Sequence, residues 1–173
     1  MLKIATEYKE QLLSLYRNTW MNEKYKYVHK PYFVDLDISQ DGWNNEGYAS
    51  VFKDDDGVEQ VVGFIEISHD RAGNSFSISC AVNFTGDPRF GIDLYRLVSR
   101  IFKRPDINRV SWSMVVGNPI ESSYQTLCEK LGGRIEGVFR QSRRTWDGRL
   151  RDMKHWGVLK SECPKKMKYV TEE

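Results

Sequence analysis

The chain has few cysteines, and their arrangement excludes two common kinds of small protein. Its three cysteines, Cys80, Cys128 and Cys163, form an odd set without the spacing of metal ligands, so neither a disulfide framework nor a metal site is predicted. Unpaired thiols are typical of a reducing compartment. We therefore expect buried thiols and a cytoplasmic location.

Long apolar runs and a charge of one sign are also missing. The longest apolar runs are far shorter than the roughly 20 residues that cross a bilayer as a helix, and Met1-Leu2-Lys3 does not open a signal-peptide pattern. The 26 basic and 24 acidic residues leave a net charge of +2. We therefore expect a soluble protein without a membrane partner, and the charge balance does not favour nucleic acid as a partner.

The length and composition fit one domain. A chain of 173 residues with 40% apolar residues can bury one core of ordinary size. No internal repeat or low-complexity segment divides it. We predict a single domain over residues 1–162 and a charged, frayed C-terminal tail over residues 163–173.

The first fifty residues combine a regular helix with an irregular segment. Leu2 to Ala5 can form a short strand, and apolar residues then recur at helical spacing, which predicts a helix from about Glu7 to Met21. The stretch from Asn22 to Gly47 mixes aromatic and charged residues without a sustained period. It is either a second short helix with loops or a lid.

Alternation with a period of two marks the middle of the chain. It predicts three strands, from Tyr48 to Phe52, from Val61 to Ile67 and from Phe76 to Val82. Turns rich in Asp, Asn and Gly separate these strands, so we expect them to follow one another as antiparallel hairpins.

Helices and strands alternate in the second half. A proline and an Asn-Pro pair mark two helix starts, and a glycine marks a helix end. The predicted elements are a helix from Pro88 to about Arg104, a strand over Arg109 to Val116, a helix from Asn118 to Gly132, and a hairpin of Ile135 to Thr145 and Leu150 to Leu159.

This order of elements decides the fold class. Consecutive hairpin strands are combined with a crossover through a helix, which requires both antiparallel and parallel pairing. We predict an α+β fold with a mixed, mostly antiparallel sheet of six to seven strands flanked by helices.

The last third of the chain carries a set of residues at fixed offsets. They are Asn118 at a helix start, Glu129-Lys130-Leu131-Gly132-Gly133 at its end, Glu136-Gly137 and Arg140 on a strand, Asp147-Gly148 in a turn, and Asp152, Trp156 and Val158-Leu159 on the last strand. This pattern resembles the closing segment of the GCN5-related N-acetyltransferases (GNAT). Within them it is most similar to the branch that acetylates protein N-termini, ribosomal proteins included. The predicted order of elements is also that of the GNAT fold.

The resemblance implies an enzyme that transfers acetyl from acetyl-coenzyme A (acetyl-CoA) directly to a primary amine, within a ternary complex and without a metal. The acceptor would be a protein N-terminal amine or a small-molecule amine such as a polyamine or an amino sugar. The enzyme would be a monomer or a homodimer. The reaction needs a pyrophosphate cradle, a base for the ammonium and an acid for the thiolate.

Two segments match the cofactor site of the family. Ala81 to Phe84 matches the strand end that bonds pantetheine, and Gly86 to Gly91 matches the phosphate turn before the central helix. The turn keeps only the last glycine of the family pattern, and Arg89, in place of the inner glycine, is expected to contact a phosphate instead. A core strand and a plain helix start are the alternatives. The implied cofactor residues are Ala81, Val82, Asn83, Phe84, Arg89, Phe90, Gly91, Ile92 and Asn118.

Three residues are candidates for the proton transfers. Tyr124 and Cys128 lie four residues apart on one helix face, and Tyr124 is the first candidate for the acid because its ordinary pKa is close to that of a thiol. Cys128 is the second candidate. Glu66 is the candidate base, because its strand can point it toward a substrate groove. A packed tyrosine, a solvated glutamate, a water chain and an already neutral amine are the alternatives.

Six basic residues crowd the final hairpin, namely Arg140, Arg143, Arg144, Arg149, Arg151 and Lys154. They form either a solvated face or a surface for an acidic peptide, a coenzyme phosphate or a nucleic acid. The alternative function is therefore a catalytically inactive GNAT-fold module that binds a protein or a nucleic acid through this hairpin. A regulator that binds acyl-CoA without turnover is a third hypothesis.

Overall fold

The computed structural model describes residues 1–29, 34–39 and 43–164. Tyr32 and Phe33 of the irregular segment, and all but the first two residues of the predicted tail, lie outside the described residues. Among the helices that are described, none is both long and apolar enough to cross a membrane.

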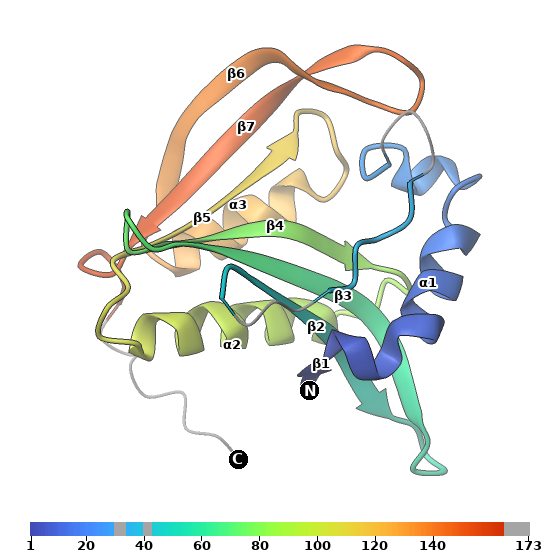
Figure 1. Cartoon of the computed structure of the whole chain (residues 1–173). Coiled ribbons are helices and arrows are strands. Elements are labelled where there is room, and N and C mark those ends of the chain that lie inside the picture. The colour runs from blue at the N-terminus through green and yellow to red at the C-terminus, as the bar shows by residue number, and fades with distance from the viewer. Residues whose placement is uncertain (30–33, 40–42, 165–173) are drawn as a thin grey trace.

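One seven-stranded sheet forms the centre of the molecule (Figure 1). Its strand order is β1-β2-β3-β4-β5-β7-β6, with β4 and β5 parallel and all other neighbours antiparallel. The predicted mixed, mostly antiparallel sheet is therefore confirmed. The strands are β1 (Leu2–Ile4), β2 (Asn45–Lys53), β3 (Glu59–Asp70), β4 (Ser75–Asn83), β5 (Arg109–Val115), β6 (Arg134–Arg144) and β7 (Leu150–Leu159).

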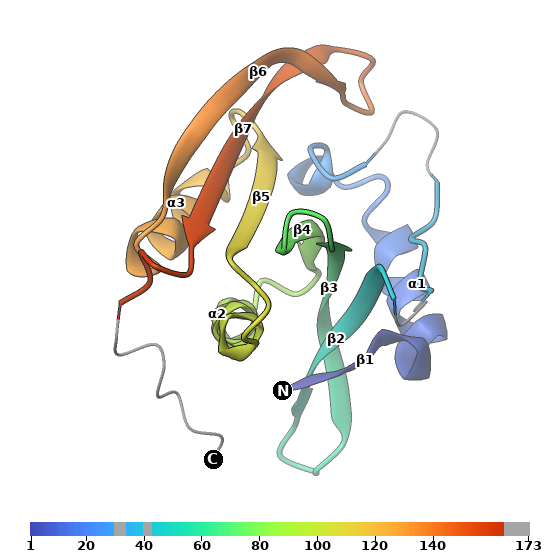
Figure 2. The same ribbon diagram turned by 60° about the vertical axis from the view of Figure 1, so that its left-hand side comes forward.

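Helices cover both faces of the sheet. Figure 2 shows α1 on one face and α2 on the other, with α3 on the same side as α2. The helices are α1 (Lys9–Asn18), α2 (Arg89–Lys103) and α3 (Glu121–Lys130), with short 3-10 helices at Ala5–Tyr8 and Glu23–Tyr25.

Two predicted helix starts differ from the structure. The first helix begins with the 3-10 turn Ala5–Tyr8, and the α-helix itself ends at Asn18. The helix predicted from Asn118 begins only at Glu121. The reason is local, because the Asn118 side chain accepts the backbone N–H of Ile120 at 3.2 Å and so holds a separate turn in front of the helix.

The two faces of the sheet bury separate apolar cores. Successive side chains of a strand point to opposite faces, so Phe64 enters one core and its neighbour Ile65 the other. The core under α2 and α3 includes Ile65, Phe76, Leu97, Val98, Trp112 and Trp156, and the core under α1 includes Leu12, Ile38, Ala49, Val51 and Phe64.

The sheet opens between its two parallel strands. β4 and β5 pair only from Ser75 with Arg109 to Ile78 with Trp112. Beyond these pairs β4 stays with β3, β5 stays with β7, and the two strands diverge (Figure 1). A wedge therefore separates residues 79–83 of β4 from residues 113–115 of β5.

Candidate functional site

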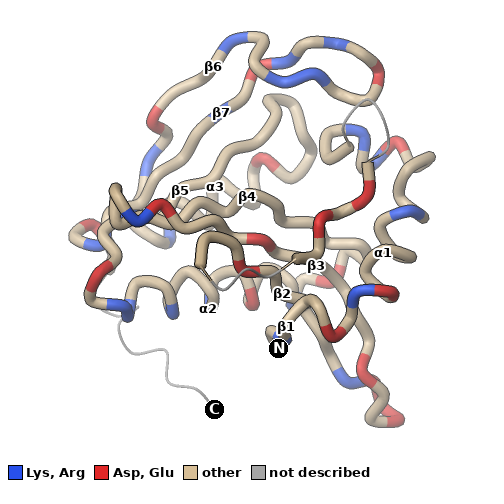
Figure 3. Tube along the Cα trace, viewed as in Figure 1, with Lys and Arg blue, Asp and Glu red and all other residues tan. Residues whose placement is uncertain are grey.

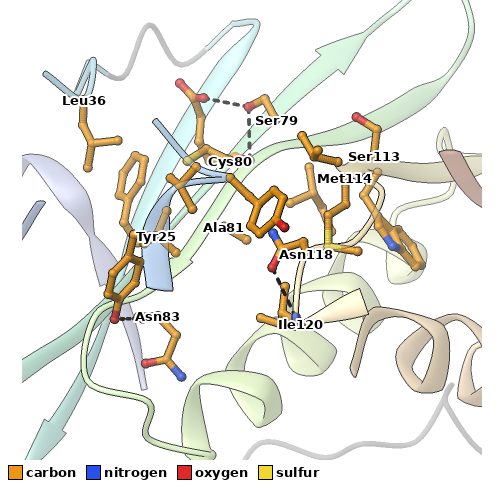
Figure 4. Close-up of a pocket in the computed structure, with 18 of the residues that line it drawn as sticks. Tyr25, Leu36, Ser79, Cys80, Ala81, Asn83, Ser113, Met114, Asn118 and Ile120 are labelled. Carbon is orange, nitrogen blue, oxygen red and sulfur yellow. Dashed lines mark hydrogen bonds between the residues drawn. The ribbon is translucent and has the colours of Figure 1, made fainter. Parts of the chain in front are cut away.

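A cavity of about 660 Å³ lies at this wedge. We call it the loop-side cavity, because Tyr16 of α1 and Tyr25, Tyr27 and Leu36 of the segment that follows form one of its walls. Figure 4 shows the opposite walls, with Ser79, Cys80, Ala81 and Asn83 on β4 and Ser113 and Met114 on β5. The divergence of β4 and β5 therefore leaves an open space within the protein.

A second cavity, of about 940 Å³, lies between α2 and α3. We call it the helix-side cavity. Its walls are mainly apolar and include Phe90, Leu94, Tyr95 and Leu127. The two cavities share four lining residues, Asn83, Gly86, Ile120 and Tyr124. They therefore meet at the wedge, and together they connect the two faces of the sheet.

Tyr124 lies where the cavities meet. Its half-buried ring stacks on Trp156, with ring centres 6.4 Å apart and an angle of 27° between the ring planes. Burial is the main cause that raises the pKa of the Tyr124 phenol. The phenol is therefore protonated at neutral pH and can donate a hydrogen bond at the junction, but the shift moves its pKa away from that of a thiol.

Cys128, the second candidate for the acid, lies elsewhere. Its side chain is fully buried in the core under α2 and α3, and it lines neither cavity. Burial raises the pKa of its thiol to about 11. The structure thus places Cys128 with the packing residues and separates it from the junction.

Glu66 lies on the wall of the loop-side cavity. Its half-buried side chain comes from β3, and its Oε2 accepts a hydrogen bond from Ser79 Oγ at 2.7 Å (Figure 4). The carboxylate can therefore face a cationic group in this cavity.

Three of the four predicted residues of the strand end line the cavities. Ala81, Val82 and Asn83 do so, whereas Phe84 packs toward the core under α1. Tyr25 fixes this strand end, because its hydroxyl donates to the carbonyl oxygens of Asn83 at 3.0 Å and of Phe84 at 2.8 Å. The segment after α1 is thereby attached to the edge of the wedge.

The turn between β4 and α2 uses its own polar groups. Asn83 Oδ1 accepts the backbone N–H of Gly86 at 2.9 Å, and Asn83 Nδ2 donates to the carbonyl of Asp87 at 2.9 Å. The Asp87 carboxylate accepts the backbone N–H of Arg89 at 2.8 Å. These two backbone donors of the expected phosphate turn are therefore bonded within the protein, as are the backbone N–H groups of Asp87, Phe90 and Gly91.

Arg89 does not take the predicted position. Its guanidinium pairs with Asp87 at 2.6 Å, lies 4.2 Å from the centre of the Phe52 ring, and lines neither cavity. The hydrogen bond from Arg89 lowers the pKa of Asp87, so this carboxylate is ionised. The expected phosphate contact is thus replaced by a local ion pair.

Other predicted cofactor residues do line the cavities. Phe90, Gly91 and Ile92 border the helix-side cavity, and Asn118 borders the loop-side cavity. Lys24 and Lys130 also line them, one in each cavity, and were not predicted. Lys24 is far from the turn in sequence, yet its Nζ lies 3.6 Å from the point that a Cβ on Gly86 would occupy.

Three of the six basic residues of the final hairpin lie close to carboxylates, and Figure 3 shows the Lys and Arg positions along β6 and β7. Arg151 binds Asp147 at 3.0 Å, Arg149 lies 3.8 Å from the same carboxylate, and Lys154 pairs with Glu121 of α3. The remaining basic residues are Arg140, Arg143 and Arg144, of which Arg143 lines the loop-side cavity. Part of the predicted basic patch is therefore neutralised within the protein.

Comparison with known proteins supports the fold. No family model matches the sequence, and a search of curated proteins found no match. A GCN5-related N-acetyltransferase from Brucella melitensis is 20% identical, with a TM-score of 0.70 over 96% of this chain and 78% of that chain. Spermidine N-acetyltransferase from Vibrio cholerae, solved with coenzyme A and spermine, is 16% identical, with a TM-score of 0.65 over 94% of this chain and 96% of that chain. These likenesses show the GNAT fold without distinguishing the N-terminal acetyltransferase branch.

Proposed function

We propose that the protein is an N-acetyltransferase that uses acetyl-CoA and acts on a primary amine. The observation that carries this proposal is the wedge between β4 and β5, which joins two cavities from opposite faces of one sheet. A wedge of this kind lets a thioester and an amine approach each other from different sides. Such positioning supplies a large part of the rate enhancement in transfer between two bound substrates.

The helix-side cavity suits the coenzyme in several respects. Its apolar walls fit the pantetheine arm, and the edge of β4 beyond Ile78 is no longer paired with β5. Gly91 has no atom within 4 Å of the position that a Cβ would take, so a ligand can approach its backbone closely. Lys130 lines this cavity, and Lys24 of the loop-side cavity reaches its edge at Gly86, so both can supply positive charge for the phosphates in place of Arg89.

In this proposal Tyr124 donates its proton to the leaving thiolate, because its side chain lies at the junction of the two cavities. The acceptor amine enters the loop-side cavity, where Glu66 faces its positive charge. We further propose a protein N-terminal amine as the acceptor, because the closing segment of the sequence is most similar to that branch. A polyamine and an amino sugar are the other amines to test.

Calorimetric titration with acetyl-CoA, and with coenzyme A alongside, tests this function. We expect micromolar binding of both, followed by acetylation of at least one amine among a short peptide, spermidine and glucosamine. Absence of acetyl-CoA binding at millimolar concentration would refute the proposed acetyltransferase activity.

A binding module without catalysis is the second candidate. It is favoured by the turn before α2, where Asn83 and Asp87 occupy backbone donors that a pyrophosphate would need. In this case Arg140 and Arg144 on the hairpin would contact an acidic partner. Absence of acetyl-CoA binding, together with binding of an acidic peptide that Arg140→Ala weakens, would support this candidate.

A further inference from the structure

A buried chain of hydrogen bonds leads away from the loop-side cavity. Tyr16 lines that cavity, whereas His29 and Thr19 line neither of the two cavities. His29 Nδ1 lies 3.2 Å from Tyr16 Oη, and His29 Nε2 lies 2.9 Å from Thr19 Oγ1. All three side chains are buried, with 5% of Tyr16, 2% of His29 and 5% of Thr19 exposed.

The hydrogen bonds decide the tautomer of His29. The Thr19 hydroxyl donates its only proton to the carbonyl oxygen of Tyr16 at 2.6 Å. Toward His29 it can therefore only accept, so Nε2 of the imidazole carries the hydrogen. In a neutral ring Nδ1 is then an acceptor, and the Tyr16 hydroxyl donates to it. The hydrogen bonds thus lead from the Tyr16 hydroxyl, beside the cavity, to His29 Nδ1, which can accept a proton.

We propose that Tyr16 and His29 form a proton relay that deprotonates the ammonium of the acceptor. This proposal rests on the proposed function and assigns the base that the reaction needs. A proton leaves the amine nitrogen, whose lone pair remains for attack, and binds Tyr16 Oη. The original phenol proton passes to His29 Nδ1 in the same step. One positive charge thereby moves from the ammonium to the imidazole, where the Nε2 hydrogen bond to Thr19 remains.

The surroundings keep both groups neutral before an amine binds. Burial is the main cause that raises the pKa of Tyr16 to about 12, and burial also lowers the pKa of His29. Three other titratable or charged groups act on Tyr16. Cys80 on β4 and Asp35 raise its pKa, whereas Arg143 on β6 lowers it. Asp35 is itself held by Arg17, with Arg17 Nε at 2.9 Å.

The relay makes a specific prediction about pH. With the relay, the amine is deprotonated on the enzyme, so the rate stays high down to the lowered pKa of His29. Without it, the rate depends on the fraction of amine that is already neutral. For an α-amine with a pKa near 8 that fraction is only about 3% at pH 6.5. Loss of the relay therefore costs rate at low pH and little at high pH.

Tyr16→Phe and His29→Asn test the relay. Phenylalanine at position 16 keeps the ring packing. At position 29 the side-chain oxygen of asparagine keeps a hydrogen-bond acceptor near the place of Nδ1, but it is not protonated as an imidazole is. We expect kcat with the best of the three amines to fall about tenfold or more at about 1.5 pH units below the pKa of that amine, and to recover to within about twofold of wild type about one unit above it. For an α-amine these values are about pH 6.5 and pH 9. The KM for acetyl-CoA should change little. Tyr8→Phe is the control, because it removes a phenol that bonds Glu59 outside both cavities.

Nitrogen NMR of the histidine ring adds a readout that needs no coenzyme. We expect His29 to be the Nε2-protonated tautomer at pH 7, with an Nδ1 shift that changes in Tyr16→Phe. An Nδ1-protonated ring would overturn the relay, as would a rate loss that is equal at every pH or absent. A wild-type protein that turns over none of the amines would overturn the proposed function and the relay together.

Discussion

Asp87 places a negative charge at the entrance that the coenzyme phosphates would use. Its ionised carboxylate lines the helix-side cavity and is held by Arg89. We predict that Asp87→Asn tightens acetyl-CoA binding about three- to fivefold at low salt, because it removes a charge that repels the phosphates. Asparagine can still accept the backbone N–H of Arg89, so the turn is retained.

Calorimetry at low and high salt measures this effect. Asp106→Asn is the matched control, since it removes the same charge from a residue that pairs with Arg104 and lines neither cavity. The gain for Asp87→Asn should shrink at high salt, where screening is stronger. Equal affinities for the variant and the wild type would show that the phosphates bind elsewhere.

Tyr124 is the residue whose hydroxyl the proposed chemistry uses at the junction. Tyr124→Phe keeps the stacking on Trp156 and removes only the proton donor. We predict that kcat falls about 10- to 100-fold, while the calorimetric affinity for acetyl-CoA stays within about twofold. Unchanged turnover in this variant would remove Tyr124 from the mechanism.

Residue positions were predictable from the sequence where a local pattern fixes them. Helical spacing placed Tyr124 on α3, and the cavity lining agrees with its proposed role without testing it. Arg89 was not predictable, because its direction depends on a competing carboxylate two residues away. Tyr16 and His29 were also missed. They are 13 residues apart, and they meet only because the segment after α1 folds back.

At the scale of elements, the passage from α3 to β6 depends on a close approach. A Cβ on Gly133 would lie 2.5 Å from Val158 Cγ2, 2.6 Å from the carbonyl oxygen of Gly157 and 2.9 Å from Cys128 Sγ. The carbonyl belongs to the sheet backbone and cannot turn aside. The glycine at the end of the recognised motif is therefore explained by packing between α3 and β7.

We predict that Gly133→Ala lowers the free energy of unfolding by about 1–3 kcal/mol, as overpacking of a tight site does. Gly137→Ala is the matched control in the same part of the chain, because a Cβ there has no atom within 4 Å. Chemical denaturation of both variants provides the measurement. If the two are equally stable, the space around Gly133 is more adaptable than the structure indicates.

The elements themselves were predictable because their signals are local. Alternation with a period of two gave the strands, and Gly, Pro and Asn gave most of their limits. The predicted start of α3 was wrong because the Asn118 side chain accepts a hydrogen bond from the backbone N–H of Ile120 and so forms a separate turn. The wedge was not predicted from the strand patterns, since no single strand encodes where two neighbours separate.

At the scale of the whole molecule, the sheet supports the helices and separates the two cavities. α1 with the following segment covers one face, and α2 with α3 covers the other (Figure 2). Each face contributes its own cavity, and the two cavities meet at the wedge. The positions of the helices thus decide which chemical groups each cavity presents, with acidic Glu66 on one side and apolar α2 and α3 side chains on the other.

Cavities on opposite faces of the sheet also bear on the order in which products would leave. In the proposed complex, coenzyme A would occupy the helix-side cavity and the product amide the loop-side cavity. The amide would then depart by a different face from the spent coenzyme. From the divergence of two strands by a few residues we therefore expect no obligatory order of product release.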